Sequence, residues 1–416
     1  MATAAVSTTP VDRIVYAPPA RQRVDSIDLL RGLVMVIMML DHVRDYFHYG
    51  TYVFDPTDLT KTSVALFFTR WITHYCAPVF FFLAGTGAYL RRARGATRSE
   101  ISWFLASRGL WLIVLELTVI RVLITGDVFP NGTYVGQTIW ALGWSMIALS
   151  VLVYLPLGAV ATIGAVMVLI HNAFDGLKIP TCAPGTPQCG AGDLVAHVLH
   201  VQGLIQLSPK GVVLLALYPL IPWIGVMALG YVFGRLYTMD AVVRRRILLR
   251  LGLGLTTLFV VLRATNLYGD PARWSAQPRP GFTALSFLNV TKYPPSLLYL
   301  CMTIGPAILL LAFMEREHRS SLGRAIVTYG RVPMFFYVLQ WIWAHGLAFP
   351  AFALAGKPTG PLFIFHNNPP DVLARAGFSL GVVYVVWAVG VIALYPLCRW
   401  YAGVKRRRSD WWLGYI

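Results

Sequence analysis

An adjacent aspartate and histidine near the end of the first apolar run are the residues best suited to proton transfer. The segment Asp41-His42-Val43-Arg44 sets an imidazole between a carboxylate and a guanidinium. A neutral imidazole can act as general base on an amine or hydroxyl, or accept an acyl group itself. Asp41 is the weaker orienting group for His42, because neighbours along a helix point about 100° apart.

Other ionisable side chains lie within or at the ends of apolar runs, where a charge is costly unless it is paired or functional. Arg70 and His74, one helical turn apart, either orient an acyl oxygen or acceptor or only satisfy each other's surroundings. Lys292 precedes Pro294-Pro295, a helix-start signal, and a cation there favours a nearby anion or developing oxyanion. The candidate substrate-binding residues are Arg44, Arg70, Asn289 and His345.

Three arginines, Arg31, Arg108 and Arg331, lie at the opposite ends of their apolar runs. Arg31 and His42 are eleven residues apart, close to three helical turns, so they share a face about 16 Å apart along the axis. An anionic head held at Arg31 would therefore place a long arm at His42, as the phosphates and pantetheine of an acyl-CoA would. The alternative is that Arg31 snorkels to phospholipid and His42 only caps a helix end.

A bundle of membrane helices must position these residues. Of the 416 residues, 57% are apolar and 13% charged, and the mean hydropathy is +0.62, whereas about a quarter of the residues of a globular protein are charged. This composition excludes a disordered chain, a cytosolic enzyme, a collagen-like fibre and a disulfide-stapled scaffold. Apolar runs of bilayer-spanning length predict ten helices, at about 29–48, 63–90, 102–125, 137–155, 157–173, 212–237, 247–265, 294–314, 327–349 and 378–399.

The distribution of basic residues predicts the orientation. Clusters such as Arg244-Arg245-Arg246 and Lys405-Arg406-Arg407-Arg408 fall on the same side, which the positive-inside rule makes cytosolic. We therefore predict an all-α, polytopic bundle of about ten transmembrane helices in the inner (cytoplasmic) membrane, with both termini cytosolic. The net charge of +17 then faces the inner leaflet, and no nucleic acid is needed as a partner. The predicted divisions are a cytosolic tail 1–28, a transmembrane domain 29–402 and a basic cytosolic tail 403–416.

The outer loop at 174–211 carries Cys182 and Cys189. In an oxidising compartment the two cysteines would form a local, structural disulfide. Asp193, His197 and His200 would share one face of a short helix, a pattern compatible with a two-histidine, one-carboxylate metal site. The loop is otherwise an ordinary amphipathic surface, and we expect no metal.

Five blocks in the same order and spacing resemble the heparan-α-glucosaminide N-acetyltransferase-like family of transmembrane acyltransferases, in particular its bacterial branch. They are Ser26–Asp45, Cys76–Gly85, Tyr218–Gly225, Thr291–Ser296 and Gly330–Tyr337.

The resemblance implies an acyl donor taken from the cytosolic side, commonly acetyl-CoA, and an acceptor amine or hydroxyl modified on the far side. Arg31 and His42 match the arginine and histidine of the opening block, and His48 is a second candidate for the active histidine. Gln340 stands where many relatives would have a histidine, although His345 follows about one turn later. Nothing in the outer loops is specific for a glycosaminoglycan.

The leading hypothesis is a multi-pass acetyltransferase that uses acetyl-CoA, without a metal, to modify a saccharide- or glycolipid-like acceptor. The alternatives are a secondary transporter or flippase for an anionic or sugar-linked substrate, and a non-catalytic scaffold. The expected partners are acyl-CoA, the acceptor and the bilayer, with a homodimer left open. The catalytic candidates are Asp41, His42, His48, His74 and Lys292, and the donor-binding candidates are Arg31, Arg108 and Arg331.

Overall fold

The structure is a computed structural model that describes residues 25–128, 132–180, 182, 189–208, 212–315, 320–364, 366–408 and 410–415. Most of the predicted tail 1–28 lies outside these residues. Its last part is already helical, because α1 runs from Asp25 to Phe47. Asp25 and Asp28 occupy the first turn of α1, where acidic side chains interact favourably with the helix dipole.

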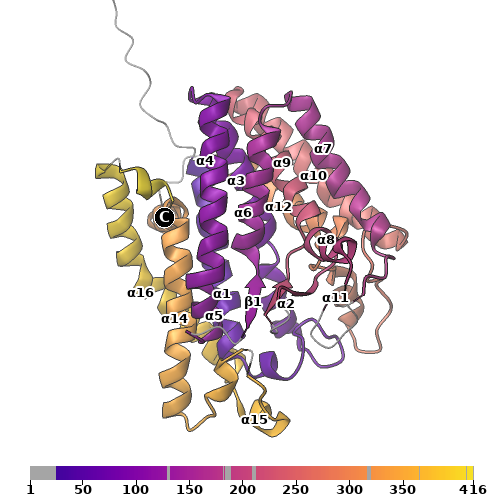
Figure 1. Ribbon diagram of the computed structural model, residues 1–416, viewed down its shortest axis with the longest axis vertical. Coiled ribbons are helices and arrows are strands. Elements are labelled where there is room, and N and C mark those ends of the chain that lie inside the picture. The colour runs from indigo at the N-terminus through magenta and orange to yellow at the C-terminus, as the bar shows by residue number, and fades with distance from the viewer. Residues whose placement is uncertain are drawn as a thin grey trace, which may run out of the picture.

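Helices make up most of the molecule (Figure 1). After α1 they are α2 (Val64–Thr73), α3 (Cys76–Ala93), α4 (Arg98–Leu115), α5 (Arg121–Thr125), α6 (Thr138–Leu152), α7 (Leu157–Ile170), α8 (Ala191–Leu199), α9 (Leu220–Phe233), α10 (Ala241–Thr265), α11 (Phe282–Leu288), α12 (Leu297–Met314), α13 (Ser321–Arg331), α14 (Pro333–Leu354), α15 (Pro370–Arg375) and α16 (Leu380–Arg407).

Each of the ten predicted spans contains helix, but fewer helices have the length and composition of a membrane span. In the described part of the chain six do, and α13 with α14 make a seventh if that pair is one span. Three predicted spans stay predictions, because α1 and α4 carry several charges and α6 has only 15 residues. The six are Val64–Ala93, Leu157–Phe174, Leu220–Thr238, Ala241–Thr265, Leu297–Met314 and Leu380–Arg407.

Several predicted spans are interrupted. The span at 327–349 bends by 94° between α13 and α14, where Pro333 lacks an N–H and begins a new helix. The span at 102–125 contains a π-helical turn, Glu116–Ile120. The span at 212–237 starts as a strand, and its helix begins only after Pro219.

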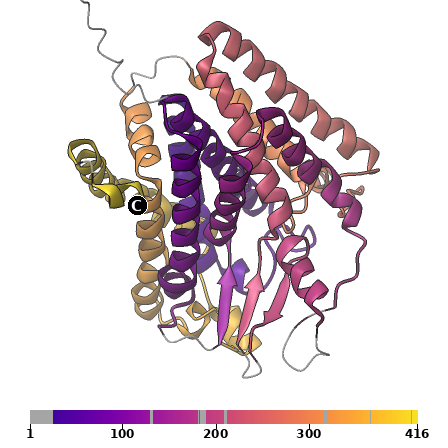
Figure 2. The same cartoon turned by 45° about the horizontal axis from the view of Figure 1, so that its top comes forward.

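A small sheet at one end of the bundle departs from the predicted all-α class (Figure 2). Its order is β1 (Thr133–Gly136), β3 (Val213–Ala216) and β2 (Gly203–Gln206). Strand β1 runs parallel to β3, whereas β2 pairs with β3 in the antiparallel sense. The fold is therefore mostly helical with one three-stranded sheet.

Helix α1 is the element that positions the candidate site, and it packs against α2, α3, α13, α14 and α16. Its approach to α13 is backbone to backbone. A Cβ atom at Gly32 would overlap the Ile326 carbonyl, and one at Gly330 would overlap the Asp28 carbonyl. The two glycines thus fix the lateral position of α1, and with it the residues along its cavity-facing side.

Candidate active site

A cavity of about 410 Å³ follows α1. Arg31, Met35 and Met38 line it, and His42 continues the same helical stripe at i, i+4, i+7 and i+11. Because α1 is uninterrupted from Asp25 to Phe47, the predicted separation of about 16 Å between Arg31 and His42 follows from helical rise. We call this space the arginine cavity.

Four arginines line the arginine cavity. Arg91 and Arg108 both approach the Phe104 ring, with guanidinium carbons 4.3 and 5.8 Å from its centroid. Arg31 lies within electrostatic range of Arg108, and its guanidinium also donates to Asp28 Oδ1 at 2.9 Å and to the Gly330 carbonyl at 3.1 Å. Such a concentration of guanidinium groups suits phosphate. The four are Arg31, Arg91, Arg94 and Arg108.

Arg91 and Arg94 were not predicted to bind the donor. Arg91 lies on the cavity face of α3, in register with Ala84 and Gly87, and Arg94 directly follows the helix. The spacing of three to four residues along Gly87, Arg91 and Arg94 is visible in the sequence, so helical periodicity could have predicted both arginines as cavity residues.

Arg331, predicted to bind the donor, is engaged elsewhere. Its guanidinium donates to Asp25 Oδ1 at 3.1 Å and lies 3.8 Å from Asp28 Oδ2. The chain bends by 94° between α13 and α14. Pro333 and Met334, after the bend, line the arginine cavity, whereas Arg331, before the bend, does not.

The His42 imidazole lies in a layer of aromatic rings. It stacks on Trp341, with ring centroids 3.7 Å apart and planes at 19°, and meets Tyr337 edge-on at 6.2 Å. His42 Nδ1 is buried without a hydrogen-bond partner among the described residues, and Trp341 Nε1 is buried near Tyr337. We call His42, Tyr337 and Trp341 the ring layer. No role was predicted for Tyr337 or Trp341, although they lie one turn apart on a predicted span.

A second cavity, of about 460 Å³, is lined by one residue of the ring layer. Trp341 lines this second cavity, whereas Tyr337 lines the arginine cavity. Asp45, Gln137 and Asn368 bring polar groups to its wall. His42 therefore contacts one ring of each cavity.

Charged residues that were predicted to belong to the site form an ion-pair cluster next to the ring layer. Asp41 accepts hydrogen bonds from Arg44 Nη2 at 2.8 Å and from Arg70 Nη1 at 2.5 Å. Arg44 also donates to Asp45 at 2.6 Å. Asp41 is thus paired with two guanidinium groups.

Lys292 and His74 also reach this cluster. Lys292 lies within electrostatic range of Asp41, His42 and His74. His74 ends α2, is 3% exposed, and its Nδ1 has no partner in the part of the chain described. The structure therefore brings these residues together from α1, α2 and the loop before α12.

Tyr293, the neighbour of Lys292, was not predicted as a site residue. The Lys292 ammonium lies 5.1 Å from the Tyr293 ring centroid, and Tyr218 meets that ring edge-on at 5.3 Å. Burial acts to raise the pKa of the Tyr293 phenol, but the positive charges of Lys292 and Arg70 outweigh it and lower the pKa below its ordinary value. A phenol with a lowered pKa is a better proton or hydrogen-bond donor.

Three other predicted residues are tied into the backbone. His48 caps a 3₁₀ turn (Tyr49–Tyr52) by accepting from Gly50 N–H at 3.0 Å. The His345 ring nitrogens lie 2.7 Å from the Leu123 carbonyl and 3.0 Å from the Leu362 carbonyl. Asn289 donates to the Thr57 carbonyl at 3.1 Å.

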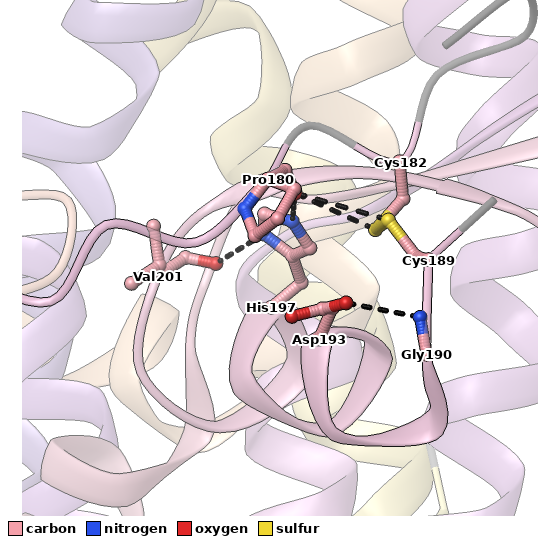
Figure 3. The surroundings of a disulfide bond; sticks show 7 residues. All are labelled: Pro180, Cys182, Cys189, Gly190, Asp193, His197 and Val201. Carbon is pink, nitrogen blue, oxygen red and sulfur yellow. Dashed lines mark hydrogen bonds between the residues drawn. A yellow bond between two sulfur atoms is a disulfide. The ribbon is translucent and has the colours of Figure 1, made fainter. Parts of the chain in front are cut away.

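Cys182 and Cys189 form a disulfide beside α8 (Figure 3). The two nearby residues of the alternative metal site have other partners. His197 Nε2 lies 2.9 Å from the Pro180 carbonyl, and Asp193 accepts from Gly190 N–H at 2.9 Å. Within the described ranges, no three His, Cys, Asp or Glu residues are grouped to hold a metal ion.

Comparison with known families identifies the chain. A search of the curated proteins found no match. Residues 23–262 match the family described as "Heparan-alpha-glucosaminide N-acetyltransferase, catalytic". The matched segment contains Arg31, His42 and Arg108, whereas Tyr337 and Trp341 follow it. It spans more than half of the 416 residues and favours an acyltransferase over a transporter. The chain therefore belongs to the heparan-α-glucosaminide N-acetyltransferase family of transmembrane acetyltransferases.

Proposed function

We propose that this protein transfers an acetyl group from acetyl-CoA, across the ring layer, to an amine or hydroxyl of a saccharide-like acceptor. The observation that carries the proposal is the position of His42. It contacts Tyr337 of the arginine cavity and Trp341 of the second cavity. One imidazole can therefore meet a donor from one side and an acceptor from the other. Family membership supports the reaction class.

The arginine cavity suits the donor. Its four arginines offer charge-assisted hydrogen bonds to the phosphates of CoA. The apolar stretch along Met35 and Met38 suits the uncharged pantetheine arm, which then ends at His42. The span of about 16 Å from Arg31 to His42 separates the anionic head from the thioester.

His42 acts as general base in this mechanism. Its neutral imidazole takes a proton from the acceptor as the acceptor nitrogen or oxygen bonds to the thioester carbon. The C–S bond then breaks, and the CoA thiolate leaves with the proton returned by the imidazolium. Lys292, Tyr293 and the Trp341 indole N–H supply positive charge and hydrogen-bond donors for the oxyanion.

The second cavity suits the acceptor, because Asp45, Gln137 and Asn368 offer polar partners for hydroxyl groups. Under the positive-inside orientation, the arginine cavity opens to the cytosol and the acceptor lies at the outer side of the inner membrane. CoA release and acceptor modification then occur on opposite sides of the ring layer.

The test uses the purified full chain with acetyl-CoA and a panel of amino sugars and neutral sugars. CoA should raise the melting temperature of the wild type, and His42→Ala should keep this shift while losing about 10²- to 10⁴-fold in kcat. His48→Ala separates the two histidine candidates and should retain most activity. His197→Ala, at a buried histidine beside the disulfide that lines neither cavity, is the matched control. Wild-type transfer by His42→Ala, or no response of the wild type to CoA, would overturn the proposal.

A further inference from the structure

The C-terminal segment lies against the arginine cavity. Helix α16 continues to Arg407, into the predicted tail 403–416, and a 3₁₀ turn (Trp411–Gly414) follows it. Figure 1 draws the C-terminal end beside α4, level with the upper end of α14. We call Trp411–Tyr415 the C-terminal segment.

Two hydrogen bonds join this segment to consecutive residues of α4. The Arg108 guanidinium donates to the Gly414 carbonyl. The Tyr415 hydroxyl lies 2.8 Å from Ser107 Oγ. Ser107 Oγ already donates to the Trp103 carbonyl at 2.7 Å, so Tyr415 is the donor in this bond.

Leu413 is the buried side chain that docks the segment on the bundle. Leu413 is 5% exposed, whereas Trp411 is 80% exposed. Leu413 is therefore the anchor, and it sets the Gly414 carbonyl over the Arg108 guanidinium. Arg108 also lines the arginine cavity, so the segment contacts a cavity residue from outside.

We propose that the C-terminal segment orients Arg108 for the anionic part of the donor, which makes Gly414 and Tyr415 positioning residues of the donor site. The inference rests on the proposed function and adds a part of the chain to it. A free arginine samples many rotamers and loses that freedom when a phosphate binds. A guanidinium that already donates to one carbonyl has lost part of this rotamer freedom before the ligand binds. Its remaining N–H groups stay available to the ligand.

The experiment measures CoA affinity by calorimetry, and KM and kcat for acetyl-CoA, in the full-length protein and its variants. Deletion of residues 411–416 should weaken CoA binding and raise the KM for acetyl-CoA by about three- to tenfold. The kcat at saturating donor and the KM for the acceptor should not change. Tyr415→Phe keeps Leu413 and should give a smaller change in the same direction, so that loss of folding is distinguishable. Trp103→Ala, 75% exposed on α4, is the control.

A double-mutant cycle tests whether the effect passes through Arg108. In the Arg108→Gln background the deletion should add nothing, because the oriented group is gone. CoA affinity unchanged by the deletion would refute the inference alone, and so would tighter binding, which would mean that the segment competes with the donor. Absence of CoA binding by the wild type would refute the proposed function together with it.

Discussion

The imidazole of His42 and the indole of Trp341 are stacked at 3.7 Å, although they are 299 residues apart in the chain. The stack joins α1 to α14 and places the proposed base against the ring that lines the second cavity. It also limits the directions from which a reacting group can approach the imidazole.

Trp341→Ala should therefore lower kcat for transfer by about ten- to hundredfold, since small displacements of a catalytic group are costly. Water would also enter the space, so acetyl-CoA hydrolysis should rise relative to transfer. Trp341→Phe keeps a ring in the stack and should retain most of the transfer activity. Free CoA and acetylated acceptor, measured in the same reaction, give both rates, and an unchanged ratio in Trp341→Ala would contradict the role of the ring.

Some of this site followed from local sequence and some did not. The alignment of Arg31 with His42 needed only helical periodicity, because α1 has no break. The stack of His42 on Trp341 depends on how α1 packs against α14, which spacing within one helix does not reveal. The partners of Arg331 also depend on tertiary structure, because the helix breaks before Pro333 and Arg331 pairs with Asp25 of α1.

The fold shows the same limit. Val213–Ala216 is as apolar as the helix that follows it, so hydropathy merged the two into one predicted span. Its parallel partner, Thr133–Gly136, is 80 residues away in sequence, with the register Thr133↔Val213. Strand pairing over such a distance leaves no periodic signal in either segment.

The Asp41–Arg70 ion pair should contribute to stability. Asp41→Asn leaves Arg70 without its carboxylate partner in a buried site, which costs about 3–5 kcal/mol for a broken buried pair. Asp41→Asn with Arg70→Gln should cost less than the sum of the two single changes. Asp371→Asn, which breaks an exposed pair with Arg375, is the control and should cost less than about 1 kcal/mol. Melting temperatures check this, and additive effects would mean that the two residues do not interact.

The pH profile should report on Tyr293. A phenol donates to an oxyanion only while it is protonated, so kcat/KM should fall as the pH rises through the pKa of Tyr293. That pKa lies below its ordinary value near 10, because Lys292 and Arg70 outweigh the effect of burial. Lys292→Gln removes one of these charges and should move the alkaline limb to higher pH, and Tyr293→Phe should abolish the limb and lower the plateau. An alkaline limb that is the same in all three proteins would assign it to another group.

The contact of Gly330 with α1 should matter for both stability and donor binding. Gly330→Ala places a Cβ atom on the Asp28 carbonyl, so α13 must move away from α1, at a cost of about 1–3 kcal/mol for overpacking. The Gly330 carbonyl also accepts from Arg31, so the same movement should raise the KM for acetyl-CoA and leave the KM for the acceptor unchanged.

Gly254→Ala is the matched control, since a Cβ there meets open space within α10 and should stabilise that helix by up to about 1 kcal/mol. Melting temperatures that fall for Gly330→Ala but not for Gly254→Ala would separate helix contact from glycine propensity. Equal changes in melting temperature and in the KM for acetyl-CoA in both variants would show that the close approach of α1 and α13 does not constrain the arginine cavity.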